Sequence, residues 1–563
     1  GHPQIRDKEY YDLIVVGAGI SGLSAAHFYR QEKPNANILI IDNHDDFGGH
    51  AKRNEFKVGD KTVLGYGGAQ TLQEPNFYSD IVKQLLNDIG VDLDGLAKAY
   101  DQEFFNRHGL RPGIHFQKQH WGEDKLIPID MGLFKGYMPF KTSELSLEQG
   151  IADMPISDAA KKELLYLMTV SEDKIPDMDE DAKWEFLYRT SYKEFLSQYV
   201  GIKEQEVFDV LEFGTIDLGQ ELAGLNALLA MNYGTMPGWG ATGLPAEDHE
   251  GGYLEPYIHH FPDGNASIAR LLVRQMVPAV APGNTMEDVV GAIFDYSKLD
   301  LPDTLVRVRL NSTVVNVAHQ GDPNTATKVQ LTYMNEGASY QLNAGKVVMA
   351  CNNGMIPYLC PALPDSQKKA LLQQVKSPIL YTTVLLRNWR AWKKLGIGGV
   401  VAPCNYHVSV QLDFPVSLGA SNFPDDPDQP IIVHMERFPY QPDRGLSDHD
   451  QFRTARYEML ATPFETIERH VREQLSSLLA PGGFDADRDI IGLTVNRWAH
   501  GYGRWYNPLF STVYEDDVDE RYPHIQGRKP FGRITIANSD SAATAMMEAA
   551  IEQAYRAVSE LPE

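Results

Sequence analysis

Cysteine is scarce in this chain, and long apolar runs are missing. Cys351, Cys360 and Cys404 are its three cysteines, and they form no C-x-x-C pair, zinc-ligand spacing or haem-attachment motif. No apolar run reaches about 18 residues, the length that a membrane-spanning helix needs. We therefore expect no integral membrane segment, and we assign no disulfide and no metal ligand. Cysteine usage alone leaves the redox compartment open.

Positive charge is also in short supply. Lys and Arg number 51 against 76 Asp and Glu, so the net charge is −25. Such a field repels nucleic acid and anionic membranes and attracts cations. We expect no nucleic-acid partner. The charge is compatible with a cationic substrate, although the solubility of an acidic surface explains it equally well.

The chain begins with a dinucleotide-binding motif. A buried strand is predicted over residues 13–16, and a helix over 23–30. Between them lies a G-x-G-x-x-G turn, made of Gly17, Ala18, Gly19, Ile20, Ser21 and Gly22. In such a turn the glycines permit a tight bend, a close approach of backbone to pyrophosphate and tight helix packing. The amino end of the helix then faces the phosphates.

An acidic residue follows the motif at the distance that ribose binding needs. A second strand is predicted over residues 37–41, and it ends in Asp42, with Asn43 next. A carboxylate at this position accepts hydrogen bonds from the ribose hydroxyls of an adenosine. The unit holds either NAD or FAD, so the choice depends on later segments.

Three later segments favour FAD because they resemble the flavin-containing amine oxidases. Residues 48–53 resemble the family's glycine pair and basic residues, and residues 65–70 its glycine-rich loop beside the flavin. Residues 532–559 resemble its C-terminal strand, loop and helix, with Ser539 at the position of the family's glutamate. The resemblance implies an FAD site made of Gly17, Gly19, Ile20, Ser21, Gly22, Asp42, Asn43, Gly48, Gly49, His50, Arg53, Gly67, Gly68, Ala69, Gln70, Val314, Ser539, Asp540 and Met547.

The resemblance also implies the fold and its division. We expect an α/β protein with a Rossmann-like FAD-binding domain of the amine oxidase type and an interleaved α+β substrate-binding domain. Residues 10–75, 251–355 and 492–563 are assigned to the first, and residues 76–250 and 356–491 to the second. Residues 76–250 have mostly helical periodicity, with a charged stretch near 158–185 interpreted as solvated helix surface. Residues 375–440 alternate as antiparallel strands do.

Six residues are candidates for the substrate site. Thr383 replaces a lysine that many polyamine oxidases place against the flavin, which indicates an electron acceptor other than oxygen. Trp498, Tyr502 and Trp505 form the densest aromatic cluster, which either holds a cationic chain by cation–π attraction or packs in the core. Glu436 is an ammonium anchor, or it forms a buried pair with Arg437 or another cation. His260 is a site histidine or a structural one.

Residues 46–56 and 260–265 resemble the bacterial spermidine dehydrogenases, a branch of this family. That resemblance implies FAD, a small cationic polyamine substrate such as spermidine, an unidentified acceptor and a non-covalent haem b without an assigned ligand. Our hypothesis is hydride transfer from the amine α-carbon to flavin N5, followed by imine hydrolysis to an aminoaldehyde and a shorter amine.

Two other functions and two compartments stay open. The alternatives are a desaturase or porphyrinogen-type FAD oxidoreductase on the same fold, and a non-catalytic flavin-binding protein. The bacterial cytoplasm and periplasm are both compatible with a soluble protein, because a signal removed before Gly1 leaves no trace in the sequence.

Overall fold

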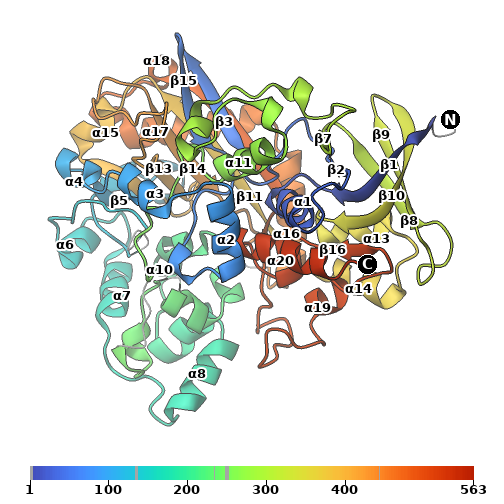
Figure 1. The fold of residues 1–563 in the computed structure, drawn as a ribbon. Coiled ribbons are helices and arrows are strands. Elements are labelled where there is room, and N and C mark those ends of the chain that lie inside the picture. The colour runs from blue at the N-terminus through green and yellow to red at the C-terminus, as the bar shows by residue number, and fades with distance from the viewer. Residues whose placement is uncertain (1–3, 133–136, 234, 247–252, 443) are drawn as a thin grey trace.

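Two β-sheets organise the chain, and each lies at the centre of one half of the molecule (Figure 1). This computed structural model describes residues 4–132, 137–233, 235–246, 253–442 and 444–563. Among those residues, no helix has the length and apolar character needed to cross a bilayer.

The first sheet combines a parallel part with a meander. The parallel part runs in the order β7, β2, β1, β10 and β16. β9 pairs antiparallel with the first half of β10, and β8 pairs with β9. The bounds are β1 Gln4–Val16, β2 Ile38–Ile41, β7 Val306–Arg309, β8 Thr313–His319, β9 Val329–Asn335, β10 Ala338–Met349 and β16 Ile534–Ile536.

β1 and β2 end in continuous apolar runs because both faces of this sheet are covered. Leu13 packs into the core that includes the helices, and Ile14 packs into the core on the side of the meander. The covering helices are α1 (Ile20–Glu32), α11 (Ala266–Met276) and α20 (Met547–Ser559). The strands predicted over residues 13–16 and 37–41, and the helix between them, are confirmed.

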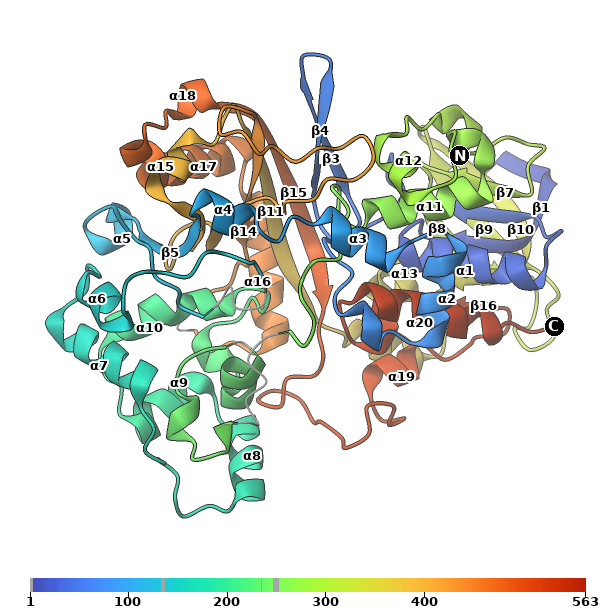
Figure 2. The same cartoon turned by 60° about the vertical axis from the view of Figure 1, so that its left-hand side comes forward.

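The second sheet is antiparallel except where β12 pairs with β5. Its order is β15, β11, β14, β13, β12, β5 and β6, and Figure 2 shows it beside the first sheet. The bounds are β5 Arg111–Phe116, β6 Lys125–Ile127, β11 Lys376–Leu386, β12 Ile397–Val401, β13 Ser409–Leu412, β14 Ile431–Arg437 and β15 Ile490–Gly503. The antiparallel strands predicted between residues 375 and 440 are confirmed.

Alternation gives this sheet one polar and one apolar face. Ser409, Glu436 and Tyr381 lie opposite one another on adjacent strands, so their side chains share a face. Leu380, one residue along, packs on the other face against α16 (Asp448–Ala461) and α17 (Phe464–Leu479). The polar side chains of the first face are therefore available to form a binding site.

Helices are the most frequent regular elements in the described part of residues 76–250, as predicted, although β5 and β6 interrupt them. α7 (Asp158–Thr169), α8 (Glu180–Arg189) and α10 (Gln205–Leu211) lie together in a lobe at the lower left of Figure 2. The prediction of a fully solvated surface is wrong at Lys183. This side chain is buried, and its ammonium group pairs with Asp173 at 2.5 Å.

The C-terminal segment differs from the expectation at two points. The helix predicted from residue 543 begins at Met547, because Ala543 has a φ of 50° and cannot continue a right-handed helix. β15 pairs with β11 along most of its length. Residues 492–503, which the sequence analysis grouped with the nucleotide half, therefore lie in the second sheet.

Candidate active site

In the glycine turn after β1, each of the three glycines has a different reason to lack a side chain. Gly17 has a φ of 111°, and a Cβ there would lie 2.7 Å from the Ala350 carbonyl oxygen. A Cβ on Gly22 would lie 1.9 Å from the Gly17 oxygen. A Cβ on Gly19 would meet only the Cα of Gly49, at 3.8 Å. Gly19 and Gly49 thus lie in close backbone contact, since a Cβ on Gly49 would lie 3.1 Å from the Gly19 Cα, and no side chain covers the backbone there, as pyrophosphate binding needs.

Asp42 lies at the end of β2 and organises the loop around it. Its carboxylate accepts hydrogen bonds from the amides of Ala18 (2.7 Å) and His44 (2.9 Å). Its carbonyl accepts one from the amide of Ser312 (2.8 Å), which leads into β8 and Val314. The structure therefore brings Asp42, the predicted ribose residue, and the strand of Val314, another predicted FAD residue, to one edge of the sheet. Asn43 is exposed at this edge.

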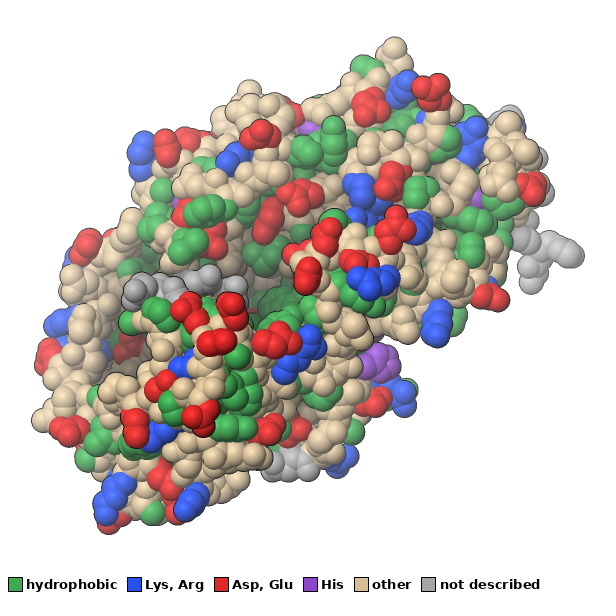
Figure 3. Space-filling view, turned by 90° about the horizontal axis from the view of Figure 1, so that it is seen from below, with side chains coloured by type: hydrophobic (Ala, Val, Ile, Leu, Met, Phe, Trp, Pro, Cys, Tyr) green, Lys and Arg blue, Asp and Glu red, His purple; other side chains and the backbone are tan. Residues whose placement is uncertain are grey.

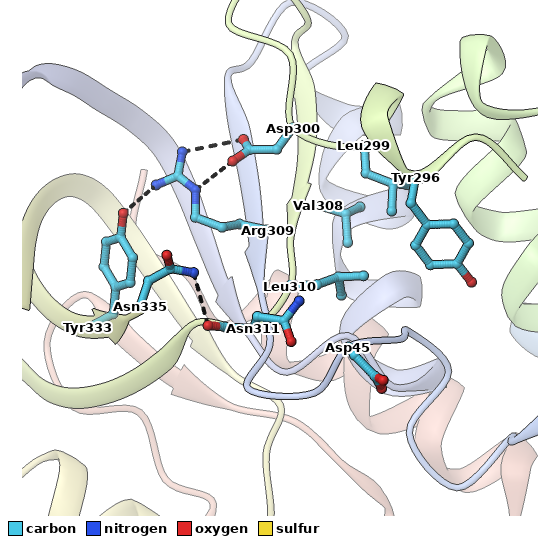
Figure 4. A pocket seen from close by; sticks show the side chains of 10 residues that line it. All are labelled: Asp45, Tyr296, Leu299, Asp300, Val308, Arg309, Leu310, Asn311, Tyr333 and Asn335. Atoms are coloured by element: carbon cyan, nitrogen blue, oxygen red, sulfur yellow. Dashed lines mark hydrogen bonds and ion pairs between the residues drawn. The ribbon is translucent and has the colours of Figure 1, made fainter. Parts of the chain in front are cut away.

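A cavity of about 370 Å³ lies beside the same edge, between Asp45, Tyr296 and Asn311 (Figure 4). Its one guanidinium belongs to Arg309, which is fully engaged. Asp300 binds Nε at 2.7 Å, Glu9 binds Nη2 at 2.9 Å, and the Tyr333 hydroxyl binds Nη1 at 3.1 Å. No lysine lines this cavity, so it offers an anionic ligand no free cation.

The C-terminal segment meets the glycine turn through Ser21. The Ser21 hydroxyl donates to the Ala550 carbonyl and accepts from the Asn538 amide, both at 2.8 Å. Asn538 and Ala543, with φ of 78° and 50°, flank the turn that carries Ser539 and Asp540. Non-glycine residues in this region of φ and ψ are costly and gather at functional sites. Met547 follows as the first residue of α20.

Sequence reasoning missed the partner of Asp540. Lys376, at the start of β11, is buried, and its ammonium group lies 2.7 Å from Oδ1 of the buried Asp540. Oδ2 accepts a hydrogen bond from the Asn353 amide at 3.0 Å. The two residues are far apart in sequence, and no local motif connects them. The pair places a cation and an anion next to the predicted flavin segment.

The loop of Gly67, Gly68, Ala69 and Gln70 lies between the two halves. A Cβ on Gly68 would lie 2.1 Å from the His50 carbonyl oxygen and 3.2 Å from Nε1 of Trp498. That Nε1 donates to the Gly67 carbonyl at 2.6 Å. Desolvation by the surrounding protein, aided by the charge of Lys376, lowers the pKa of His50 to about 3, although the side chain is exposed to solvent. The structure thus brings His50 and Trp498 together at the loop.

Side-chain hydroxyls and amides form a hydrogen-bonded chain above this loop. Tyr502 bonds Tyr381 (3.1 Å), and Gln70 donates to Tyr381 (3.2 Å). The Tyr137 hydroxyl donates a hydrogen bond to Oε1 of Gln70 (3.1 Å) and accepts one from Nε2 of Gln411 (3.3 Å). Burial raises the pKa of all three tyrosines, so they stay neutral. Gln70, predicted as a cofactor residue, is the centre of this chain.

Glu436 lies on the polar face among these groups. Its Oε2 accepts a hydrogen bond from Ser409 at 2.8 Å, and its buried Oε1 has no partner among the described residues. Burial, and then the charge of Asp217, raise the pKa of Glu436 to about 8. The alternative pairing with Arg437 is wrong, because Arg437 lies on the opposite face and pairs with Glu458 at 2.7 Å.

Asp217 is a second carboxylate that sequence reasoning missed. Burial raises its pKa, while the charge of Arg504 and a hydrogen bond from the Tyr502 hydroxyl oppose that rise. The residue is nevertheless accessible to solvent. Asp217 is thus an accessible carboxylate that the surrounding protein desolvates. From below, the surface is hollowed near its middle, and acidic side chains stand around the hollow (Figure 3).

Three predicted residues have contacts of other kinds, although His260 also borders this group through a hydrogen bond with the Gln70 backbone. Trp505 follows the end of β15, is 46% exposed and packs against Arg504. His260 is buried and stacks on Phe414 at 4.0 Å, with a pKa lowered to about 3 by burial. Arg53 pairs with Glu55 and with the buried Asp263. These geometries favour structural roles for His260 and Arg53.

Thr383 lies where the two halves touch. Its hydroxyl donates to the Tyr66 carbonyl at 3.1 Å, one residue before Gly67. The side chain is fully buried. The hydroxyl therefore joins the sheet to the glycine loop.

Comparisons with known proteins agree with this architecture. A family model described as an NAD(P)-binding Rossmann-like domain matches residues 15–89. The chain has the flavin-containing amine oxidase fold. Putrescine oxidase with bound putrescine is 16% identical, covers 98% of this chain and 99% of its own, and gives a TM-score of 0.52. Cyclohexylamine oxidase from Brevibacterium oxydans IH-35A is 15% identical over 98% of each chain, with a TM-score of 0.53.

A third solved structure belongs to another functional class. A candidate protoporphyrinogen oxidase from Exiguobacterium sp. 255-15 is 14% identical over 97% of each chain, with a TM-score of 0.52. No curated protein matches the sequence. The predicted fold class is confirmed: a Rossmann-like nucleotide-binding domain lies beside a mostly antiparallel sheet.

Proposed function

We propose that this chain is an FAD-dependent dehydrogenase of polyamines such as spermidine, which passes electrons to an acceptor other than oxygen. One observation carries the proposal. Glu436 and Asp217 are two desolvated carboxylates beside a chain of neutral tyrosines and amides, and the charge of Asp217 contributes to the raised pKa of Glu436. Two desolvated carboxylates suit a ligand with more than one ammonium group, because a buried charge needs a partner.

FAD fits the residues present. The backbone at Gly19 and Gly49 would hold the pyrophosphate, Asp42 the ribose, and the loop from Gly67 to Gln70 the ring. The Lys376–Asp540 pair and the amino end of α20 would lie at the ring's polar edge. Bound FAD supplies the electron acceptor for the hydride that leaves the amine α-carbon.

The protein's own groups would bind and orient the amine. Glu436 would accept hydrogen bonds from one ammonium group through Oε1, and Asp217 from another. The reacting nitrogen must be neutral, so that its lone pair forms the imine as the α-hydrogen leaves with two electrons. Water then adds to the imine carbon and releases an aminoaldehyde and a shorter amine. Orientation by the tyrosine chain contributes much of the rate.

The choice of acceptor rests on Thr383. Its hydroxyl is occupied by the Tyr66 carbonyl, and it offers no amine to hold a water molecule at the ring. Haem b is a further part of this proposal, and it rests on the resemblance in sequence alone. A Soret band in the purified protein tests it.

The visible spectrum of the purified protein under nitrogen tests the function. We expect a flavin absorption band at about 450 nm. After spermidine is added, this band should bleach within seconds. A flavin band that spermidine, putrescine and n-butylamine all leave unchanged contradicts the substrate class. Turnover of a tetrapyrrole or polyene without any amine would favour the porphyrinogen-type alternative.

A further inference from the structure

Four side chains with metal-binding atoms meet at one place in the second half of the molecule. His120 lies in the short helix α5 (Lys118–Trp121), and Asp209 lies in α10. Glu212 follows α10, and Cys404 lies in the loop between β12 and β13. None of them belongs to the amine site proposed above.

The donor atoms of His120, Asp209 and Cys404 lie close enough together to reach one ion, and Glu212 lies next to them through Cys404. Nε2 of His120 lies 3.3 Å from Oδ2 of Asp209, and Sγ of Cys404 lies 3.3 Å from Oε2 of Glu212. The ligand atoms of His120, Asp209 and Cys404 all lie within 4.8 Å of one another. Bonds of about 2.0–2.3 Å around tetrahedral zinc place donors about 3.3–3.7 Å apart.

The surrounding contacts fix these side chains. The indole nitrogen of Trp121 donates to the Pro403 carbonyl at 3.1 Å, which ties α5 to the loop that carries Cys404. Gln205 donates to the second carboxylate oxygen of Asp209 at 2.8 Å, which leaves Oδ2 directed at His120. His120 is exposed, and Asp209 and Cys404 are half-buried, so an ion can enter from solvent.

We propose that His120, Asp209 and Cys404 bind one transition-metal cation of the zinc type, with Glu212 as the neighbouring carboxylate. A donor set of imidazole, thiolate and carboxylate selects a borderline metal over Mg²⁺ or Ca²⁺, which prefer oxygen alone. Binding replaces the thiol hydrogen bond from Cys404 to Glu212 with a metal–sulfur bond, and the thiol proton leaves to solvent. The two carboxylates and the thiolate then surround the divalent charge. This proposal does not depend on the proposed function.

Cobalt(II) titration of chelator-treated protein tests the site. We expect one Co²⁺ per chain, a thiolate-to-cobalt absorption in the near-ultraviolet difference spectrum, and displacement by one Zn²⁺. C404S should remove the band, and H120A and D209N should each weaken cobalt binding by at least about tenfold. C360A and H449A are matched controls that should leave it unchanged.

Two results would overturn the metal site. One is the absence of stoichiometric cobalt binding by the wild-type protein, which would leave a hydrogen-bonded cluster only. The other is a cobalt–thiolate band that survives in C404S, which would place the metal elsewhere. Circular dichroism of each variant establishes that the loss of binding is not a loss of fold.

Discussion

Glu436 shows most clearly how one residue gains its chemistry from its position. Its place on β14 puts it opposite Ser409 and Tyr381 on a buried polar face, where one oxygen has a partner and the other has none. E436Q should raise KM for spermidine by about 10- to 100-fold, because a hydrogen bond to a charged group contributes about 1.5–3 kcal/mol. Steady-state kinetics with an artificial acceptor measures this, with the exposed E465Q as control.

The protonation of Glu436 predicts a pH dependence. Its pKa is raised to about 8, so in the free site the carboxyl is neutral below that pH and charged above it. A cation binds the charged form, so kcat/KM for spermidine should rise with pH through about 8. The substrate's own amines titrate too, and E436Q isolates the contribution of the residue. If the wild type and E436Q share one pH profile, Glu436 does not bind the ammonium group.

At the scale of elements, the glycines of the turn after β1 serve two different requirements: Gly22 is needed for folding, and Gly19 is needed for cofactor binding. Gly19 has ordinary backbone angles and room for a Cβ, whereas a Cβ on Gly22 collides with the Gly17 carbonyl. G19A should therefore keep the melting temperature of the cofactor-free chain and lose most bound flavin. Flavin content and thermal melting measure the two effects. G354A, whose Cβ would meet only the side chain of Asn352 at 3.5 Å, is the control. A G19A protein with full flavin content would contradict the pyrophosphate site.

The arrangement of the elements also explains which parts of the fold and the site could be predicted from the sequence. The turn after β1 and the second strand were predictable, because glycine spacing and apolar runs are local signals. Asp217, Tyr137 and Lys376 were not, because each reaches the site through pairings between distant segments. Trp505 was grouped with Trp498 and Tyr502 by sequence density, but β15 ends at Gly503 and the next residues no longer follow its face.

At the scale of the molecule, the net charge of −25 should speed the arrival of a cationic substrate. We expect kcat/KM for spermidine to fall as salt rises, because the screening length shrinks to about 10 Å at 0.1 M. The singly charged n-butylamine should show a weaker dependence. Equal salt dependence for the two amines would show that the acidic surface serves solubility alone.

The most direct test of the central claim is anaerobic reduction of the bound flavin by spermidine in the wild type, E436Q and D217N. We predict rapid bleaching in the wild type, with saturation at a concentration that rises at least about tenfold in each variant. The same variants should react with n-butylamine with a smaller change, because it carries one charge. Identical saturation by spermidine in all three proteins would contradict the claim that Glu436 and Asp217 recognise a polyamine.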